Sequence, residues 1–217
     1  MVKSMGLFKN LRAKNIQAER KACHQREEIQ HHFNDFKTLL AEFYIRQDVW
    51  NFDKVDFRIG CLRGRSVIVP ADVKAVYIAD PGNRESITSL ECVSTTGKCI
   101  ESFLILKGEI IKEKLFDNDI SDDAILAVSP SGFTNDRLTY QWLEHFERSA
   151  NVNQELGRRW RVLVMDGHSS HLSDNFKLFF WRHQILPSLL PSHSTHLLQP
   201  LDVGIFSAIK ANHQNEF

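Results

Sequence analysis

The chain has 217 residues, of which 42% are hydrophobic, so it is long enough to bury a sizeable core as one large domain or two small ones. Its 27 Lys and Arg residues balance 27 Asp and Glu residues, which excludes a chain that is strongly basic or acidic throughout. There is no apolar run of about 18 residues, so no membrane span is expected. The four dispersed cysteines include no C-x-x-C pair and argue against a zinc ribbon or a disulfide framework.

The charge is unevenly distributed along the chain. Residues 1–26 hold seven Lys and Arg residues and one acid, so this segment carries +6 and the remainder carries −6. Such a segment is either the solvated face of a helix or a basic arm that contacts phosphates. The sequence alone leaves both interpretations open.

The first half of the chain predicts one helix followed by strands. Residues 27–45 have apolar side chains at helical spacing, and we expect this stripe to pack into the core. A strand is expected at about 48–54, where Asp53 lies among apolar residues. Further strands are expected at 66–69, 75–79, 86–95 and 99–106, the last two joined by a hairpin turn at Thr96-Gly97. The apolar stripe of the helix consists of Ile29, Phe33, Phe36, Leu39, Leu40 and Phe43.

The second half predicts helices alternating with strands. The acidic segment 109–136, broken by Pro130 and Gly132, is expected to be a surface connection. Because antiparallel strands are followed by β/α units, the fold class is α/β with a mixed sheet. The expected elements are a helix at 136–150, a strand at 161–166, a helix at 174–183, a short strand at 185–190 and a last helix at 202–215.

Two aspartates in the second half stand at positions suited to a functional site. Asp166 follows the apolar run Val162–Met165, and Gly167 then turns the chain. A carboxylate at the carboxyl end of a buried strand lies where open α/β sheets bind their ligands. Asp202 comes 36 positions later, just after Pro200, at the expected start of the last helix.

Three motifs resemble a known family. V-M-D-G-H-S-S-H (164–171) and P-S-H-S-T-H-L-L-Q-P-L-D-V-G-I-F (191–206) resemble the second and third catalytic blocks of DDE superfamily transposases of the pogo/Tigger/jerky type. N-F-D-K-V-D-F-R-I-G (51–60) resembles the first block, with Lys54 and Asp56 where the family has Glu and Gly. The resemblance covers roughly residues 45–210.

The resemblance implies a fold and a chemistry. It implies an RNase H-like fold, a mixed central sheet flanked by helices, in which Asp53, Asp166 and Asp202 bind two Mg²⁺ or Mn²⁺ ions. Three carboxylates that repel one another need such a cation, and oxygen ligands suit these metals. The implied reaction is cleavage or transfer of DNA strands by in-line displacement.

The resemblance also implies an organisation and a setting. Residues 1–44 are expected to be a basic, helical arm, and 45–217 a DDE-type catalytic domain that is truncated at its carboxyl end. Relatives carry helix-turn-helix DNA-recognition domains, and we expect that region to be absent from this chain. DNA is the expected partner, a homodimer is compatible with the sequence, and work on chromosomal DNA implies a nuclear location.

Several alternatives remain open. Each aspartate taken singly also suits an ordinary structural role, and Asp56 could replace Asp53 as the first acid. Asp166 and the neighbouring histidines would supply enough ligands for zinc, although the spacing H-S-T-H is not that of a helical zinc motif. A transposon-derived protein without catalytic activity, serving as a nucleic-acid-binding or protein-interaction module, is the second functional hypothesis. The histidines whose roles stay open are His168, His171, His193 and His196.

Overall fold

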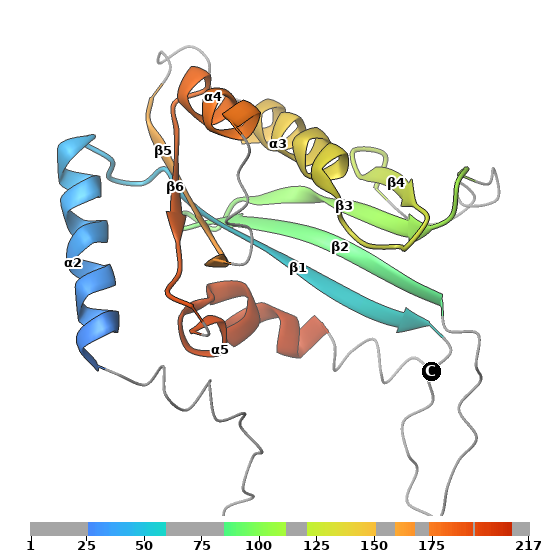
Figure 1. The fold of residues 1–217 in the computed structure, drawn as a ribbon, viewed down its shortest axis with the longest axis horizontal. Helices are drawn as coiled ribbons and strands as arrows, with labels where there is room; N and C mark the ends of the chain where they lie inside the picture. Colours follow the sequence, from blue (N-terminus) through green and yellow to red (C-terminus); the bar gives the residue numbers. More distant parts are fainter. Residues whose placement is uncertain are drawn as a thin grey trace, which may run out of the picture.

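The computed structural model describes residues 26–59, 85–111, 121–150, 159–167, 174–192 and 194–209. Figure 1 shows a central sheet with helices on both of its faces and helix α2 standing at one end. The strands expected at 66–69 and 75–79 lie outside the described residues. So do most of the basic segment 1–26 and three of the four histidines, which are His168, His171 and His193.

The described part of the chain forms one mixed sheet of six strands in the order β4-β3-β2-β1-β5-β6. β1 pairs antiparallel with β2, and β2 pairs antiparallel with β3. The pairs β1/β5, β5/β6 and β3/β4 are parallel. The mixed α/β sheet expected from the order of elements is therefore confirmed. The strands are β1 (Val49–Ile59), β2 (Glu85–Ser94), β3 (Cys99–Lys107), β4 (Ile125–Ser129), β5 (Arg161–Met165) and β6 (Ile185–Leu189).

The predicted hairpin between β2 and β3 is confirmed. Gly97 has a φ of 81°, in the left-handed region that glycine enters without a steric penalty, and its N–H donates to Ser94 O at 3.0 Å. The Ser94 hydroxyl accepts from the backbone N–H of Lys98 at 3.0 Å and closes the turn. These bonds close the turn after which β3 returns along β2.

Two helices cover one face of the sheet (Figure 1), α3 (Asp136–Ala150) and α4 (Asp174–Arg182). Asn135 begins α3 by accepting from Leu138 N at 3.0 Å. Aromatic side chains join this helix to β1: the rings of Trp142 and Phe52 are 3.9 Å apart, and those of Phe146 and Trp50 are 5.7 Å apart. Burying each such side chain contributes about 1.5–3 kcal/mol. The two predicted helices are confirmed, and their apolar faces form the main core.

A smaller segment covers the opposite face. It consists of the short helix α5 (Thr195–Leu198) and a turn of π-helix, η5 (Leu201–Ile205). Leu201 and Phe206 are buried against Val55 of β1 in a second apolar cluster. Because side chains alternate along a strand, β1 sends Trp50 and Phe52 towards α3 and sends Val55 towards η5.

One predicted connection contains a strand. Residues 109–136 were expected to be a surface connection, but Ile125–Ser129 forms β4, which pairs in parallel with β3. The apolar sequence Ile-Leu-Ala-Val within this acidic segment buries Ala127 against the main core. A run of four apolar residues can form an edge strand even where the flanking residues are charged.

The apolar stripe of α2 (Arg26–Glu42) does not lie in the core, so that expectation was wrong. None of the six stripe residues is buried, and Phe33 keeps 44% of its surface exposed. The helix is joined to the body at its carboxyl end, where the rings of Phe43 and Trp160 lie 4.9 Å apart. Helical periodicity predicted the helix correctly but does not identify the surface against which its apolar side packs. Among the helices of the described residues, none is long and apolar enough to cross a membrane.

Candidate active site

Asp53 and Asp166 lie side by side on neighbouring strands. β1 and β5 are paired in parallel with Asn51 opposite Val164. Continuing this register by two residues brings Asp166, directly after β5, level with Asp53. Side chains that are level in a parallel pair point to the same face. The expectation that the two aspartates lie on neighbouring strands is confirmed, as is the position of Asp166 at the carboxyl end of its strand.

Asp202 comes to the same place on the segment that covers this face. It lies on η5, between Leu201, which is buried in the second cluster, and an exposed turn. Its charge acts on Asp53, as does that of Asp166. The structure therefore brings the three predicted carboxylates together at one end of the parallel strands, although they are up to 149 positions apart in sequence.

A pair of side-chain amides fixes this arrangement. Asn51 Nδ2 donates to Val164 O at 3.2 Å and to Gln199 Oε1 at 3.0 Å. Asn51 Oδ1 accepts from Leu201 N at 3.1 Å, and Gln199 Nε2 donates to Phe52 O at 2.8 Å. We call these two residues the amide clamp. It joins β1, β5 and the segment of η5, which are the three elements that carry the aspartates.

One carboxylate oxygen of Asp53 is buried without a hydrogen-bond partner. Only 8% of its surface is exposed. Its Oδ1 accepts from Lys54 N at 2.8 Å, whereas its Oδ2 is buried and has no hydrogen-bond partner in the described part of the chain. An unpaired buried carboxylate oxygen is costly and requires an explanation.

The surroundings of Asp53 disfavour its charged form. Burial, together with the charges of Asp202 and Asp166, raises the pKa of Asp53 from 3.8 to about 6, against the opposing effects of the Lys54 N–H, which donates to Oδ1, and of the nearby Gln199 amide. A divalent cation would remove this penalty, because it would occupy the unpaired oxygen and neutralise the repulsion among the three carboxylates. The donor set, which consists of carboxylate oxygens, suits Mg²⁺ or Mn²⁺.

As they stand, the three carboxylates do not form a metal coordination shell. Among the residues that the structure describes, no group of three or more His, Cys, Asp or Glu side chains stands close enough to hold a metal ion. The aspartates are near enough to influence the pKa of Asp53 but not near enough to bind one ion jointly. Binding would have to draw them together by side-chain rotation or by a small movement of η5.

The turn after β5 depends on a glycine. A Cβ on Gly167 would lie 2.9 Å from Leu190 O, which is closer than such atoms approach. Leu190 N also donates to Met165 O at 3.0 Å, so the chain after β6 lies directly against the end of β5. The absence of a side chain at Gly167 therefore allows Asp166 to lie at this crowded edge of the sheet.

Asp56 is separated from the site, which argues against it as the first acid. It is three residues from Asp53 along β1, so its side chain points to the opposite face. There it accepts from the Thr88 hydroxyl at 2.7 Å. The exposed side chain of Lys54 also leaves the strand on that face, and only its backbone N–H reaches Asp53.

The sequence interpretation did not single out Asn51 and Gln199. Both residues lie within the motifs that carry the family resemblance, next to the aspartates, and Gln199 is fully buried at 0% exposure. A polar amide close in sequence to Asp53 and another close to Asp202 were the available signal. His196 is half-buried on α5, and the other three histidines of the zinc alternative lie outside the described residues, so that alternative stays a hypothesis.

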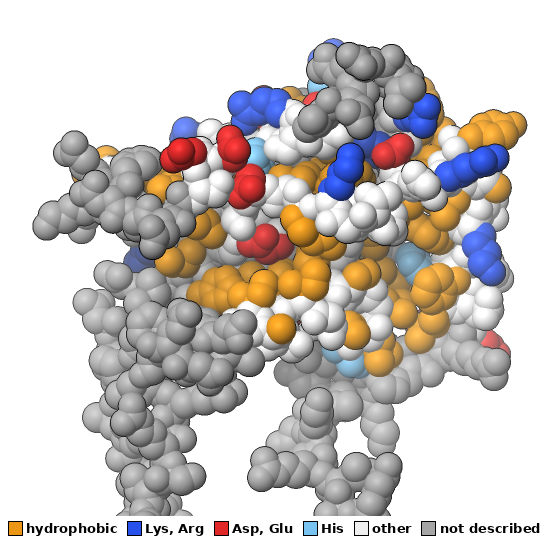
Figure 2. All heavy atoms as spheres, turned by 180° about the vertical axis from the view of Figure 1, so that it is seen from behind, with side chains coloured by type: hydrophobic (Ala, Val, Ile, Leu, Met, Phe, Trp, Pro, Cys, Tyr) orange, Lys and Arg blue, Asp and Glu red, His pale blue; other side chains and the backbone are white. Residues whose placement is uncertain are grey.

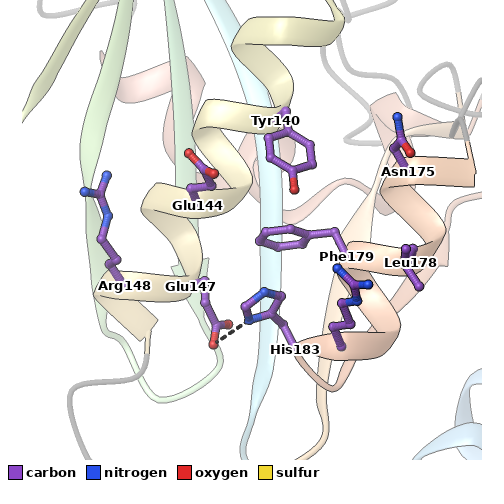
Figure 3. A pocket seen from close by; sticks show the side chains of 9 residues that line it. Tyr140, Glu144, Glu147, Arg148, Asn175, Leu178, Phe179 and His183 are labelled. Carbon is purple, nitrogen blue, oxygen red and sulfur yellow. Dashed lines mark ion pairs between the residues drawn. The ribbon is translucent and has the colours of Figure 1, made fainter.

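A groove between two helices on the other face does not contain the aspartates. It measures about 710 Å³ and lies between α3 and α4. Figure 3 shows Phe179 in its centre between Tyr140 and His183, and His183 Nδ1 lies 3.1 Å from Glu147 Oε1. Glu147 also forms a buried ion pair with Arg161 at the start of β5. Within this groove, Glu147 therefore links α3 to His183, after α4, and to the start of β5.

Comparison with known proteins identifies the family. The DDE superfamily endonuclease family matches residues 83–217, which is more than half of the chain and includes Asp166 and Asp202 but not Asp53. The chain is 28% identical over 92 residues to the human protein named "Pogo transposable element with ZNF domain", covering 42% of this chain and 6% of that protein. It is 32% identical over 171 residues to a Cochliobolus lunatus protein named "MFS-type transporter clz9", covering 78% of this chain and 18% of that protein.

Solved structures share the fold. The paired-end complex of Mos1 mariner transposase with Mg matches with a TM-score of 0.61 and 13% identity, over 98% of this chain and 55% of the Mos1 chain. The corresponding complex with Mn gives a TM-score of 0.60 and 12% identity over the same shares. The chain thus spans about half of the Mos1 chain and less than a fifth of the curated relatives. The expected RNase H-like fold is confirmed, and the chain belongs to the DDE superfamily endonuclease family.

Proposed function

We propose that this domain cleaves or transfers DNA strands with two divalent metal ions, Mg²⁺ or Mn²⁺, held by Asp53, Asp166 and Asp202. The observation that carries the proposal is the buried, unpaired Oδ2 of Asp53, which lies within the influence of the two other carboxylates. Clustered acids with an unsatisfied oxygen are costly to a fold unless a cation compensates them.

The three aspartates would bind the metal ions, and the amide clamp would hold the aspartates in position. Bound ions would activate an attacking water or DNA 3′-hydroxyl and stabilise the departing oxygen of an in-line displacement. Asp53 supplies the free oxygen, and with a pKa of about 6 it is ionised at neutral pH. The amide clamp holds the strand that bears Asp53 against the segment that bears Asp202.

Membership of the family supports DNA as the substrate. The Mos1 structures that share the fold are named as paired-end complexes with Mg and Mn. We carry the metal requirement and DNA binding over to this chain as proposals, together with a nuclear location, which would follow from work on chromosomal DNA. The same proposal includes a homodimer as the form in which the domain acts.

The first test is Mn²⁺ binding, measured by water-proton relaxation. We expect the wild-type chain to bind Mn²⁺ and the Asp202→Asn variant to bind it at least about tenfold more weakly, because one carboxylate is lost without a change in size. Asp174→Asn is the matched control, since Asp174 is an exposed acid that pairs with Lys177 on α4. A folded wild-type chain that binds no Mn²⁺, with or without a DNA oligonucleotide, would contradict the proposal.

One observation favours the alternative of a catalytically silent module that binds nucleic acid or protein. The three aspartates, as the structure has them, do not stand at metal-binding separations. Under this alternative the chain would bind DNA with strong salt dependence but would show no metal-dependent cleavage. Incubating a labelled duplex with the protein and Mn²⁺ separates the two functions, because only the enzyme shortens the labelled strand.

A further inference from the structure

We propose that a second groove, at the opposite end of the parallel strands from the aspartates, binds single-stranded DNA. We call it the Tyr44 groove. It has a volume of about 830 Å³ and is formed by the segment between α2 and β1, the start of β1, the β2–β3 turn and the segment before β5. This inference goes beyond the proposed function, with which it shares only the premise that the chain works on DNA.

The position of the groove separates it from the aspartates. Asp48 lines the groove, and Asp53 lies five residues further along β1. At about 3.3 Å per residue this is roughly 16 Å. Asp166 is likewise at the far end of β5 from Arg161, which also lines the groove. A DNA strand in the groove would therefore be a separate segment from the one that meets the carboxylates.

The groove is positively charged. Arg46, Lys98 and Arg159 line it from three different segments, and all three side chains are exposed. None of them forms an ion pair with a residue of the described ranges, and among the lining residues the only acid is Asp48, which is half-buried. Figure 2 shows Lys and Arg beside exposed hydrophobic side chains at the edge of the molecule on the α2 side. Three exposed cations, with a single acid among the residues that line the groove, suit the phosphates of a nucleic-acid strand.

Tyr44 occupies a backbone position that favours glycine. Its φ is 54°, and the N–H of the following residue, Ile45, donates to Leu40 O at 2.9 Å, which is the helix-ending pattern in which the left-handed residue is usually Gly. Its side chain is 90% exposed, so the ring contributes little to packing. A bulky aromatic residue at a strained and exposed position suggests a role for the ring itself.

A second aromatic surface lies beside Tyr44. Trp160 lines the groove, with its ring 4.9 Å from that of Phe43 and 5.2 Å from that of Trp181. Trp181 keeps 66% of its surface exposed. Bases stack on such rings regardless of sequence, while cations along the same groove follow the phosphates. Unpaired bases are required for this stacking, and that requirement identifies the ligand as single-stranded rather than duplex DNA.

The test measures binding of fluorescein-labelled oligothymidine by anisotropy in EDTA, so that no metal is involved. The key variant is Tyr44→Gly. We expect it to bind oligothymidine at least about fivefold more weakly, since a stacked base is lost. The same variant should melt at a higher temperature than the wild type, because glycine relieves the backbone strain. Tyr44→Phe should bind like the wild type. A purely structural role for Tyr44 would not give weaker binding together with a more stable fold.

The charge of the groove is tested by its salt dependence. The double variant Arg46→Ala/Arg159→Ala should lower the slope of log K against log salt by about 1.4, at about 0.7 for each phosphate contact. Arg137→Ala/Arg148→Ala, which removes two exposed cations from α3, is the matched control and should leave the slope unchanged.

Three results would overturn the proposal. They are absence of oligothymidine binding by the wild type, unchanged binding in Tyr44→Gly and in the double arginine variant, and preferential binding of an acidic peptide over oligothymidine. None of these results depends on whether the aspartates bind Mn²⁺, so failure here is distinguishable from failure of the proposed function.

Discussion

Asn51 on β1 and Gln199, 148 positions later, join their side-chain amides by a hydrogen bond of 3.0 Å in the interior of the protein. Through this bond the strand that carries Asp53 is tied to the segment that carries Asp202. Asn51 also bonds Val164, two residues before Asp166. The amide clamp is therefore the shared support of all three predicted metal ligands, although it contributes no carboxylate itself.

The first prediction concerns the amide clamp. Asn51→Ala leaves Leu201 N and Gln199 Oε1 without the partners that Asn51 provides, so we expect the free energy of unfolding to fall by about 2–3 kcal/mol. In the protein that remains folded, Mn²⁺ affinity should fall by about tenfold or more, as found when groups that orient metal ligands are removed. Urea unfolding and water-proton relaxation measure the two effects.

The matched control is Gln30→Ala, which removes an exposed amide-to-amide bond to Asn34 on α2 and should change neither stability nor Mn²⁺ affinity. Unaltered Mn²⁺ affinity in folded Asn51→Ala would contradict the positioning role.

The second prediction is a pH dependence of stability caused by Asp53. Its pKa is raised from 3.8 to about 6, so between these values the folded chain holds a proton that the unfolded chain has released. The contribution of Asp53 to stability is therefore greatest below about pH 4 and is lost as the pH rises through 6. The loss is at most about 3 kcal/mol and is reduced by solvent screening.

Asp53→Asn tests this sign. In EDTA the variant should be more stable than the wild type at pH 7.5, and this difference should be smaller at pH 4.5, as measured by urea unfolding. Asp123→Asn, at an exposed turn before β4, serves as the control and should follow the wild type at both values. A wild type that becomes more stable relative to Asp53→Asn as the pH rises would show that the sign is wrong.

Sequence patterns predicted the helices, strands and turns that have a clear local signal. The spacing of Leu138, Trp142 and Phe146 predicted α3, because the face that they form is buried as a unit. The run Val162–Met165 predicted β5 and placed Asp166 at its end, and Thr96-Gly97 predicted the hairpin. In each case the signal is local: an apolar face at helical spacing, a continuous apolar run or a turn dipeptide.

The features that the sequence did not predict depend on distant partners. Nothing in the stripe of α2 indicates that Phe33 remains exposed, since periodicity does not identify the packing partner. The amide clamp joins residues 148 positions apart, so no local pattern shows that Asn51 and Gln199 meet. The proximity of the three aspartates was inferred from family resemblance. Only the folded chain tests it, because the sheet order β2-β1-β5 places the strands of Asp53 and Asp166 side by side.

The third prediction concerns Gly167. A methyl group there would meet Leu190 O at 2.9 Å, and because that atom is backbone it cannot move away without shifting β6 or the end of β5. We expect Gly167→Ala to lower the free energy of unfolding by about 1–3 kcal/mol. By displacing Asp166 it should also weaken Mn²⁺ binding. The matched control is Gly204→Ala on η5, two residues from Asp202, where an added Cβ meets nothing within 4 Å. Equal Mn²⁺ affinities for the two variants would argue against the crowding at the end of β5.

The fourth prediction concerns the buried ion pair of Glu147 and Arg161, which joins α3 to the start of β5. Arg161 also donates from Nη2 to His183 O at 3.1 Å, and its guanidinium carbon lies 5.3 Å from the centre of the Phe146 ring. Glu147→Ala removes one charge and leaves the other buried among these groups. The expected loss is about 3–5 kcal/mol in the free energy of unfolding, because an uncompensated buried charge remains.

Glu144→Ala is the control for this prediction, since Glu144 lies on the same helix and borders the same groove but is exposed. Its loss should cost less than about 1 kcal/mol. Arg161 and Asp166 stand at opposite ends of β5, so Glu147→Ala should reduce Mn²⁺ binding only in proportion to the protein that unfolds. Normal stability in Glu147→Ala would mean that Arg161 reaches solvent or another acid. Weaker Mn²⁺ binding per folded molecule would instead mean that the start of β5 helps to set the position of Asp166.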